Sequence, residues 1–135
     1  FNMSDFEQIS IHSGFMKHNG GLLFKVISET ESEFKTKINE NHLNRAGITH
    51  GGYIASIIDA GIGTGVHRAT KNNIFVTISL DIKFIGSTKI GDEIIGKVMI
   101  EKITNSLVFA SCKIKSKNKI IALGSGVWKR TNNSF

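Results

Sequence analysis

The run of residues 44–67 constrains this chain most, because it is the longest weakly polar stretch in the sequence. Between positions 51 and 66 its only charged side chain is Asp59. Burying an unpaired carboxylate is costly, so Asp59 must be paired, protonated or functional. The apolar residues follow helical spacing, at positions 54, 57, 58, 62 and 66. The run therefore predicts a helix over about residues 50–68 that the rest of the chain wraps.

The start of this predicted helix is a candidate binding site for an oxygen atom. Thr49 is the expected N-cap residue, its hydroxyl bonding a free amide of the first turn. Gly51 and Gly52 then leave bare backbone N–H groups at the positive end of the helix dipole. Such an end suits a phosphate, or an oxygen that gains negative charge during a reaction.

Three glycines, at positions 61, 63 and 65, lie inside the same helix. Each weakens a helix by about 1 kcal/mol relative to alanine. That cost predicts that something packs close to the helix backbone.

The composition indicates one globular domain over residues 1–135. No apolar segment is long enough to span a membrane, and the N-terminal residues lack the basic-then-apolar order of a secretory signal. Cys112 is the only cysteine, which excludes an internal disulfide and a cysteine-based metal site. We expect a cytoplasmic protein.

The net charge of +6 comes mostly from lysines that are scattered among acidic residues. This pattern favours a solvated surface over nucleic-acid binding, with attraction of a polyanionic small ligand as the alternative. Lys113, Lys115 and Lys117 alternate toward a turn. They are interpreted as charges that protect a sheet edge, or as contacts to the phosphate groups of such a ligand.

The remaining elements flank the central helix. A short helix is expected over about 4–18, where Ser4 and Glu7 have capping-box spacing, and a frayed tail over about 130–135. Alternating residues predict strands at about 22–28, 34–39, 75–85, 93–103, 107–116 and 120–129. The last four form an antiparallel meander, so the fold class is α+β, with one sheet of about six strands around one helix.

The motif Asn44-Arg45-x-Gly47-x-x-His50-Gly51-Gly52, with Asp59 eight residues after Gly51, resembles the hotdog-fold acyl-CoA thioesterases of the phenylacetic-acid-degradation (PaaI-like) branch. The resemblance covers most of the chain, including the strand–strand–helix–four-strand order. It also includes the turn Phe84-Ile85-x-x-x-Lys89-x-Gly91-Asp92.

The resemblance implies a role for each matching residue. Asn44 and the Gly51 N–H would hold the thioester carbonyl oxygen, with His50 beside them. Asp59 would be the general base or the nucleophile, and Thr77 would position water or Asp59. It also implies dimers or dimers of dimers with sites between subunits, acyl-CoA as substrate, and no metal or cofactor.

The residues themselves favour a site shared between two chains. Thioester hydrolysis needs a base or nucleophile and donors for an oxyanion, which Asp59 and Gly51 can supply. Eight helical residues separate these two by about 12 Å, too far to touch one carbonyl. Two antiparallel helices related by a two-fold axis would pair Gly51 of one chain with Asp59 of the other. We therefore expect a homodimer.

The acyl pocket is expected to be lined by apolar residues of the helix and the following strand. The residues assigned to substrate binding are Gly52, Ile54, Ile57, Ile58 and Phe84.

Plainer interpretations stay open for the candidate residues. Asp59 could be a structural helix acid, His50 a packing residue, Asn44 a turn residue and Thr77 an ordinary strand residue. The other histidines lack metal-ligand spacing and are expected at the surface or in packing: His12, His18, His42 and His67.

Two rival functions also stay open. A hotdog enoyl-CoA hydratase or acyl carrier protein dehydratase would use a His and an acid in other motifs, often near proline, and this chain has no proline. A non-catalytic acyl-CoA binding or regulatory domain would bind its ligand without turnover.

Overall fold

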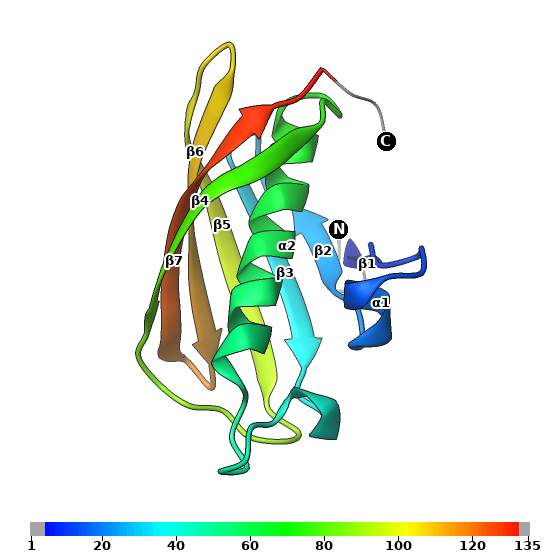
Figure 1. Cartoon of the computed structure of the whole chain (residues 1–135), viewed down its shortest axis with the longest axis vertical. Helices are drawn as coiled ribbons and strands as arrows, with labels where there is room; N and C mark the ends of the chain where they lie inside the picture. The colour runs from blue at the N-terminus through cyan, green and yellow to red at the C-terminus, as the bar shows by residue number, and fades with distance from the viewer. Residues whose placement is uncertain (1–4, 133–135) are drawn as a thin grey trace.

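The computed structural model describes residues 5–132, which form one antiparallel sheet and one long helix (Figure 1). The sheet order is β1-β2-β3-β5-β6-β7-β4, so β1 and β4 are its edges. No helix in this part of the chain is both long and apolar enough to cross a membrane. The strands are β1 (Glu7–Gln8), β2 (Leu23–Val26), β3 (Glu31–Lys37), β4 (Phe75–Phe84), β5 (Glu93–Ile103), β6 (Leu107–Ser116) and β7 (Lys119–Arg130), and the helices are α1 (Phe15–His18), the single 3-10 turn η2 (Glu40–His42) and α2 (Gly51–Ala69).

The N-terminal segment differs from the helix predicted over 4–18. Its helix is only the four residues of α1, and Ser4 lies outside the described residues. The segment instead pairs with β2: Ile9 N donates to Leu22 O at 3.1 Å, and the Gln8 side chain accepts a bond from Leu22 N. Tertiary pairing therefore overrides the local capping signal and adds β1 as a seventh strand.

The C-terminal segment stays paired beyond the start of the predicted frayed tail at 130. Arg130 is the last residue of β7, and its N–H donates to Ser106 O at 2.8 Å. Thr131 N donates to Ile74 O at 3.0 Å. The described tail is therefore held to the sheet through Thr131, and residues 133–135 lie outside the described residues.

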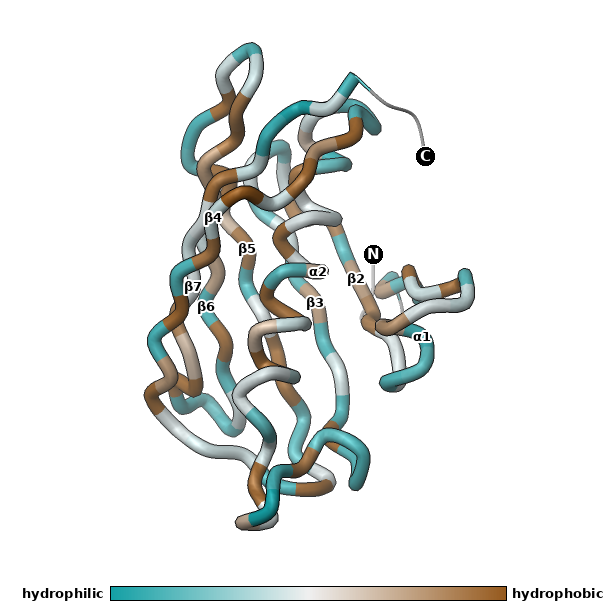
Figure 2. Tube along the Cα trace, in the orientation of Figure 1, coloured by the Kyte–Doolittle hydropathy of each residue, from teal (hydrophilic) through white to brown (hydrophobic). Residues whose placement is uncertain are grey.

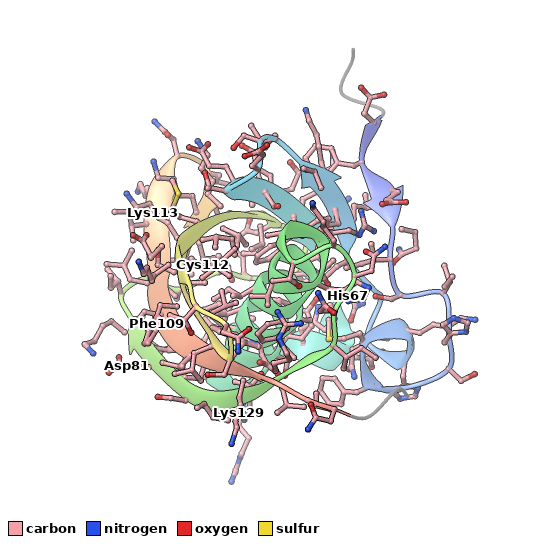
Figure 3. All side chains as sticks on the ribbon, turned by 90° about the horizontal axis from the view of Figure 1, so that it is seen from above. His67, Asp81, Phe109, Cys112, Lys113 and Lys129 are labelled. Atoms are coloured by element: carbon pink, nitrogen blue, oxygen red, sulfur yellow. The ribbon has the colours of Figure 1, made fainter. Side chains whose placement is uncertain are left out.

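The core lies between the inner face of the sheet and one face of α2. Burial alternates along β5 and β6, as the period of a strand requires. Figure 2 shows hydrophobic and hydrophilic residues mixed along the strands of the sheet. The view from above shows the sheet curving around the helix, with Lys113, Asp81 and Lys129 on its outer side (Figure 3). The helix contributes to the core its residues Tyr53, Ile54, Ile57, Ile58, Ile62 and Val66.

One face of α2 is not covered by the sheet, which corrects the prediction of a fully wrapped helix. Asp59, Ala60, Gly63 and Thr64 are half-buried and line a cavity. The apolar residues of the helix fall on a single stripe, so they bury only the side that faces the strands.

A phenylalanine ring fixes how closely α2 approaches the sheet. Phe34 on β3 is fully buried, and its ring fills the space where side chains of Gly61 and Gly96 would lie. Any Cβ atom on either glycine would collide with this ring. Glycine at position 61 destabilises the helix, and this cost predicted that something packs close to the helix backbone. The Phe34 ring is the group that packs there.

His42 is a packing residue, one of the two roles expected for it. It is 1% exposed and stacks on Tyr53 with a 3.6 Å distance between ring centroids. Its Nδ1 accepts a bond from Asn39 N at 3.0 Å, so the neutral ring carries its proton on Nε2, which lies 2.6 Å from Asn19 O. Burial raises the pKa of the neighbouring Tyr53 hydroxyl, which bonds Thr36.

We expect Gly61→Ala to lower the free energy of unfolding by about 1–3 kcal/mol, because the added methyl group overpacks the Phe34 ring. Gly63→Ala is the matched control on the same helix, since its Cβ would meet only an ordinary contact and should stabilise the helix by up to about 1 kcal/mol. Urea unfolding followed by circular dichroism measures both. Equal stability changes in the two variants would contradict the role given to Phe34.

Candidate active site

The N-terminus of α2 is capped by His50 and not by Thr49. The His50 Nδ1 atom accepts a bond from Gly52 N at 2.8 Å. Thr49 faces the loop before β5 instead, where its hydroxyl donates to Thr88 O and accepts from the Thr88 hydroxyl at 2.8 Å. Since Nδ1 is an acceptor, the neutral His50 ring carries its proton on Nε2, a donor on an exposed side chain.

Asn44 closes the turn that leads into the helix, as its plainer interpretation predicted. Its Oδ1 accepts bonds from Ala46 N at 2.8 Å and Ile48 N at 3.3 Å. Gly47 completes the turn with a positive φ of 83°. Within residues 5–132 the Asn44 Nδ2 group makes no hydrogen bond, so this donor is available to a ligand while Oδ1 holds the loop.

Gly51 is the first residue of α2, and its N–H points out of the helix as one of the unpaired donors of the first turn. Among residues 5–132 this N–H has no acceptor. The Phe84 ring lies beside it, 3.3 Å from the position that a Gly51 Cβ would take. Gly52, by contrast, already donates its N–H to His50 Nδ1, so this N–H is not bare as was expected.

Asp59 and Thr77 form the second part of the site. The Thr77 hydroxyl donates to Asp59 Oδ1 at 2.6 Å, which joins the helix to edge strand β4. A bulge interrupts the pairing of β4 with β7 between Thr77 and Ser79. Bulges commonly re-aim a side chain next to a functional site. The hydroxyl holds one carboxylate oxygen and leaves Oδ2 for a water molecule or an acyl carbon.

The two parts of the site are far apart within one chain. Eight helical residues between Gly51 and Asp59 span about 12 Å. The geometry of α2 is regular over this interval, so no bend shortens the distance. One chain by itself therefore does not assemble both parts on one carbonyl group.

Asp59 faces a cavity of about 640 Å³ between α2, the N-terminal segment and the β4–β7 edge. Figure 3 shows His67, farther along the same helix, on the side that faces the N-terminal segment. The cavity is lined by Asp59, Ala60, Gly63, Thr64, His67, Arg68, Phe75, Thr77 and Trp128, together with Glu7, Gln8, Ile9, Ser10, Ile11 and Met16.

None of the predicted acyl-pocket residues lines this cavity. Ile54, Ile57 and Ile58 are buried in the core against the sheet, at 4% exposure or less. Ile54 and Ile57 lie on the opposite side of the helix from Asp59, and Ile58 lies about 100° around the helix from it. Phe84 is exposed, yet it lies beside Gly51 and outside the cavity.

Sequence reasoning missed the cavity residues Gly63 and Trp128. Gly63 lies four residues after Asp59 and so on the same helix face, a spacing that could have identified it. Trp128 is brought there only by the pairing of β7 with β4, in which it stands opposite Thr77.

The three alternating lysines do not protect a sheet edge, because β6 lies between β5 and β7. Lys117 in the following turn pairs with Asp92 at 3.2 Å. The Lys89 backbone N–H, followed by the Lys117 ammonium, lowers the pKa of the Asp92 carboxyl. This cluster closes the turn before β5 and lies outside the Asp59 cavity.

Comparison with known proteins gives consistent matches. The family model described as Thioesterase superfamily matches residues 46–122. Acyl-coenzyme A thioesterase 13 of Mus musculus is 34% identical over 91 residues, which cover 65% of this chain and 64% of that relative. The chain thus spans a little less than two thirds of that protein.

Two solved structures have a similar fold. The zebrafish thioesterase superfamily member 2 superposes with a TM-score of 0.81, at 22% identity and 90% coverage of both chains. A mutant of the phenylacetic acid degradation protein PaaI from Thermus thermophilus superposes with a TM-score of 0.78, at 17% identity, covering 86% of this chain and 97% of that one.

We expect His50→Ala to lower the free energy of unfolding by about 1 kcal/mol, because the bond to Gly52 N is lost. His50→Asn should keep most of that stability, since asparagine is among the best N-cap residues. Urea unfolding of the two variants beside the native protein measures the difference. An equal loss in both would show that capping is not what the imidazole contributes.

Proposed function

The chain belongs to the thioesterase superfamily, and we propose that it hydrolyses the thioester of an acyl-coenzyme A to a free acid and coenzyme A. The observation that carries this proposal is the Asp59 carboxylate, oriented by Thr77 and facing a cavity. The name of the mouse relative supports the same substrate class. The reaction needs only water as second reactant, and coenzyme A is part of the substrate. We therefore propose a site without a resident metal or cofactor.

Three donors at the start of α2 fit the carbonyl oxygen of the thioester. The Gly51 N–H and the Asn44 Nδ2 group are unused within the described residues, and His50 Nε2 lies on the exposed side of its ring. A helix N-terminus favours negative charge, so this end of α2 stabilises the oxyanion that forms when the carbonyl carbon is attacked.

Asp59 supplies the attacking group in one of two ways. As general base it takes a proton from water, whose oxygen bonds the acyl carbon; the carbon–sulfur bond then breaks and the proton passes to the leaving thiolate. As nucleophile it bonds the acyl carbon itself, and the carbon–sulfur bond breaks to release the coenzyme A thiolate. Water then hydrolyses the resulting anhydride, which frees the acid and restores Asp59, and the thiolate takes up the proton that this water loses. Isotope-labelled water separates the two, because label in the Asp59 carboxylate after a single turnover requires direct attack.

The two parts of the site meet if two chains pair along β4. This strand is an edge of the sheet, and it exposes apolar side chains: Ile78 is 54% and Phe84 57% exposed. An exposed apolar edge invites strand pairing with another chain. Two-fold pairing there sets the α2 helices antiparallel, with Gly51 of one chain near Asp59 of the other. We propose a homodimer, or a pair of such dimers, in the cytoplasm.

We expect Asp59→Asn to lower the rate of thiol release from acyl-coenzyme A by about 10² or more, because the base or nucleophile is lost. Glu93→Gln removes an exposed carboxylate far from the cavity and should leave the rate unchanged. The assay follows free thiol with short, long and aromatic acyl groups. Equal release by the native protein and Asp59→Asn would remove Asp59 from the mechanism.

No thiol release by the native protein from any of these substrates would contradict the proposed function. Loss of enoyl-coenzyme A absorbance without thiol release would point instead to a hydratase. Tight acyl-coenzyme A binding without turnover would point to a binding domain.

A further inference from the structure

Gly63 is the one glycine inside α2 that the protein's own packing does not require. A Cβ at Gly61 would collide with the Phe34 ring, and one at Gly65 would meet Val98 Cγ1 at 3.1 Å. A Cβ at Gly63 would meet only Trp128 Nε1, at an ordinary contact distance of 3.8 Å. Glycine inside a helix destabilises it relative to alanine. The missing side chain at position 63 therefore serves something that occupies the space outside the helix.

The space beside Gly63 is the cavity that Asp59 faces. Gly63 lies one turn after Asp59 on the same face of α2, and both residues line the cavity wall. The rise of four helical residues places Gly63 about 6 Å farther along the helix. A molecule that reacts at Asp59 can thus extend over the bare backbone of Gly63.

Trp128 supplies an unused donor at this place. The side chain is 1% exposed, and its Nε1–H makes no hydrogen bond to any residue between 5 and 132. No fully buried side-chain nitrogen or oxygen atom in this range lacks a partner, so Nε1 reaches the open space of the cavity. Trp128 lines the cavity and stands opposite Thr77 in the pairing of β7 with β4. An indole N–H that opens on a cavity can donate to water or to a polar atom of a bound molecule, so this donor is available to a ligand.

The rest of the cavity wall is mixed. Ile9, Met16 and Phe75 are partly buried apolar side chains on its sides. Arg68 at the far end is already paired with Glu7 at 2.8 Å. Hydrocarbon therefore fits the middle of the cavity, while the Trp128 N–H fixes one polar atom in it.

Building on the proposed hydrolysis, we propose that Gly63 and Trp128 determine the acyl specificity of this protein. The acyl group lies across Gly63 and accepts a hydrogen bond from the Trp128 Nε1–H. The preferred substrates are acyl groups that carry a hydroxyl or keto oxygen about 6–8 Å beyond the thioester carbon, slightly more than one helical turn.

Binding can be measured without catalysis, because Trp128 is the only tryptophan of the chain. The probes are two hydrolysis-resistant thioethers, hexyl-coenzyme A and ω-hydroxyhexyl-coenzyme A, followed by Trp128 emission. The hydroxylated probe should bind about tenfold more tightly, the value of one neutral hydrogen bond. It should also shift the emission, as a bond to the indole N–H does. Equal affinity and no shift would overturn the proposal.

Two variants test the two residues separately. Trp128→Phe keeps an aromatic ring and loses the donor, so the preference for ω-hydroxyhexanoyl- over hexanoyl-coenzyme A in kcat/KM should vanish. Gly63→Leu fills the cavity, so kcat/KM for both hexanoyl substrates should fall by about tenfold or more. Thiol release from acetyl-coenzyme A, whose acyl group does not reach Gly63, gives the reference rate against which the hexanoyl rates of each variant are compared.

The outcomes separate this proposal from the function on which it rests. Two outcomes would overturn the specificity assignment alone. In the first, the protein hydrolyses acetyl-coenzyme A but shows no preference between the hexanoyl substrates. In the second, the preference survives Trp128→Phe. No hydrolysis of any substrate would contradict the proposed function, whereas selective binding of the hydroxylated thioether would still support the assigned cavity. A Gly63→Leu protein with unchanged melting temperature and unchanged kcat/KM for both hexanoyl substrates would exclude Gly63 from the acyl-binding site.

Discussion

The packing of one phenylalanine ring against two glycines sets the rotation of the central helix. Phe34 of β3 fills the space left by Gly61 on α2 and Gly96 on β5, so position 61 must face the sheet. Successive residues of a helix are rotated by about 100°, which turns positions two apart to nearly opposite sides. Asp59 and Gly63 flank position 61 by two residues. The packing that turns Gly61 inward therefore turns both of them toward the cavity.

This rotation places different groups at the N-terminus and in the middle of the helix. The N-terminus presents the Gly51 N–H and is held by the His50 cap and the turn that Asn44 closes. Two turns later the Asp59 side chain points from the helix toward edge strand β4, where the Thr77 hydroxyl bonds one of its oxygens. Since the helical rise keeps these groups about 12 Å apart, the proposed chemistry on one carbonyl calls for the helix of a second chain. Edge strand β4 exposes the apolar side chains through which a second chain would pair in the proposed dimer.

Much of the fold was predictable because its signals are local. The α+β hotdog fold and the thioesterase family are confirmed, and the helix and the last four strands lie within about two residues of their expected bounds. These elements have clear periods of 3.6 and two residues. The predicted N-terminal helix was largely wrong, because the bond between Ile9 N and Leu22 O depends on a distant segment.

The site was predictable only in part, because contacts between segments that are distant in the sequence bring some of its residues together. The family resemblance predicted that Thr77 positions water or Asp59. The two side chains are neighbours and form a hydrogen bond. Ile54 and Ile58, chosen for the acyl pocket, lie in the core and not along the Asp59 cavity, because composition does not tell which side of a helix faces the sheet. Trp128 enters the cavity through strand pairing, which no local pattern records. The catalytic roles themselves stay predictions.

The claim that one site takes Asp59 from one chain and Asn44 from its partner can be tested by mixing two inactive proteins. Asp59→Asn and Asn44→Ala are unfolded together, refolded, and compared with each variant alone by thiol release. Random pairing gives half mixed dimers, each with one intact site, so activity should return to about a quarter of the native value. Activity no higher than that of the separate variants, in a mixture shown to contain mixed dimers, would contradict the shared site.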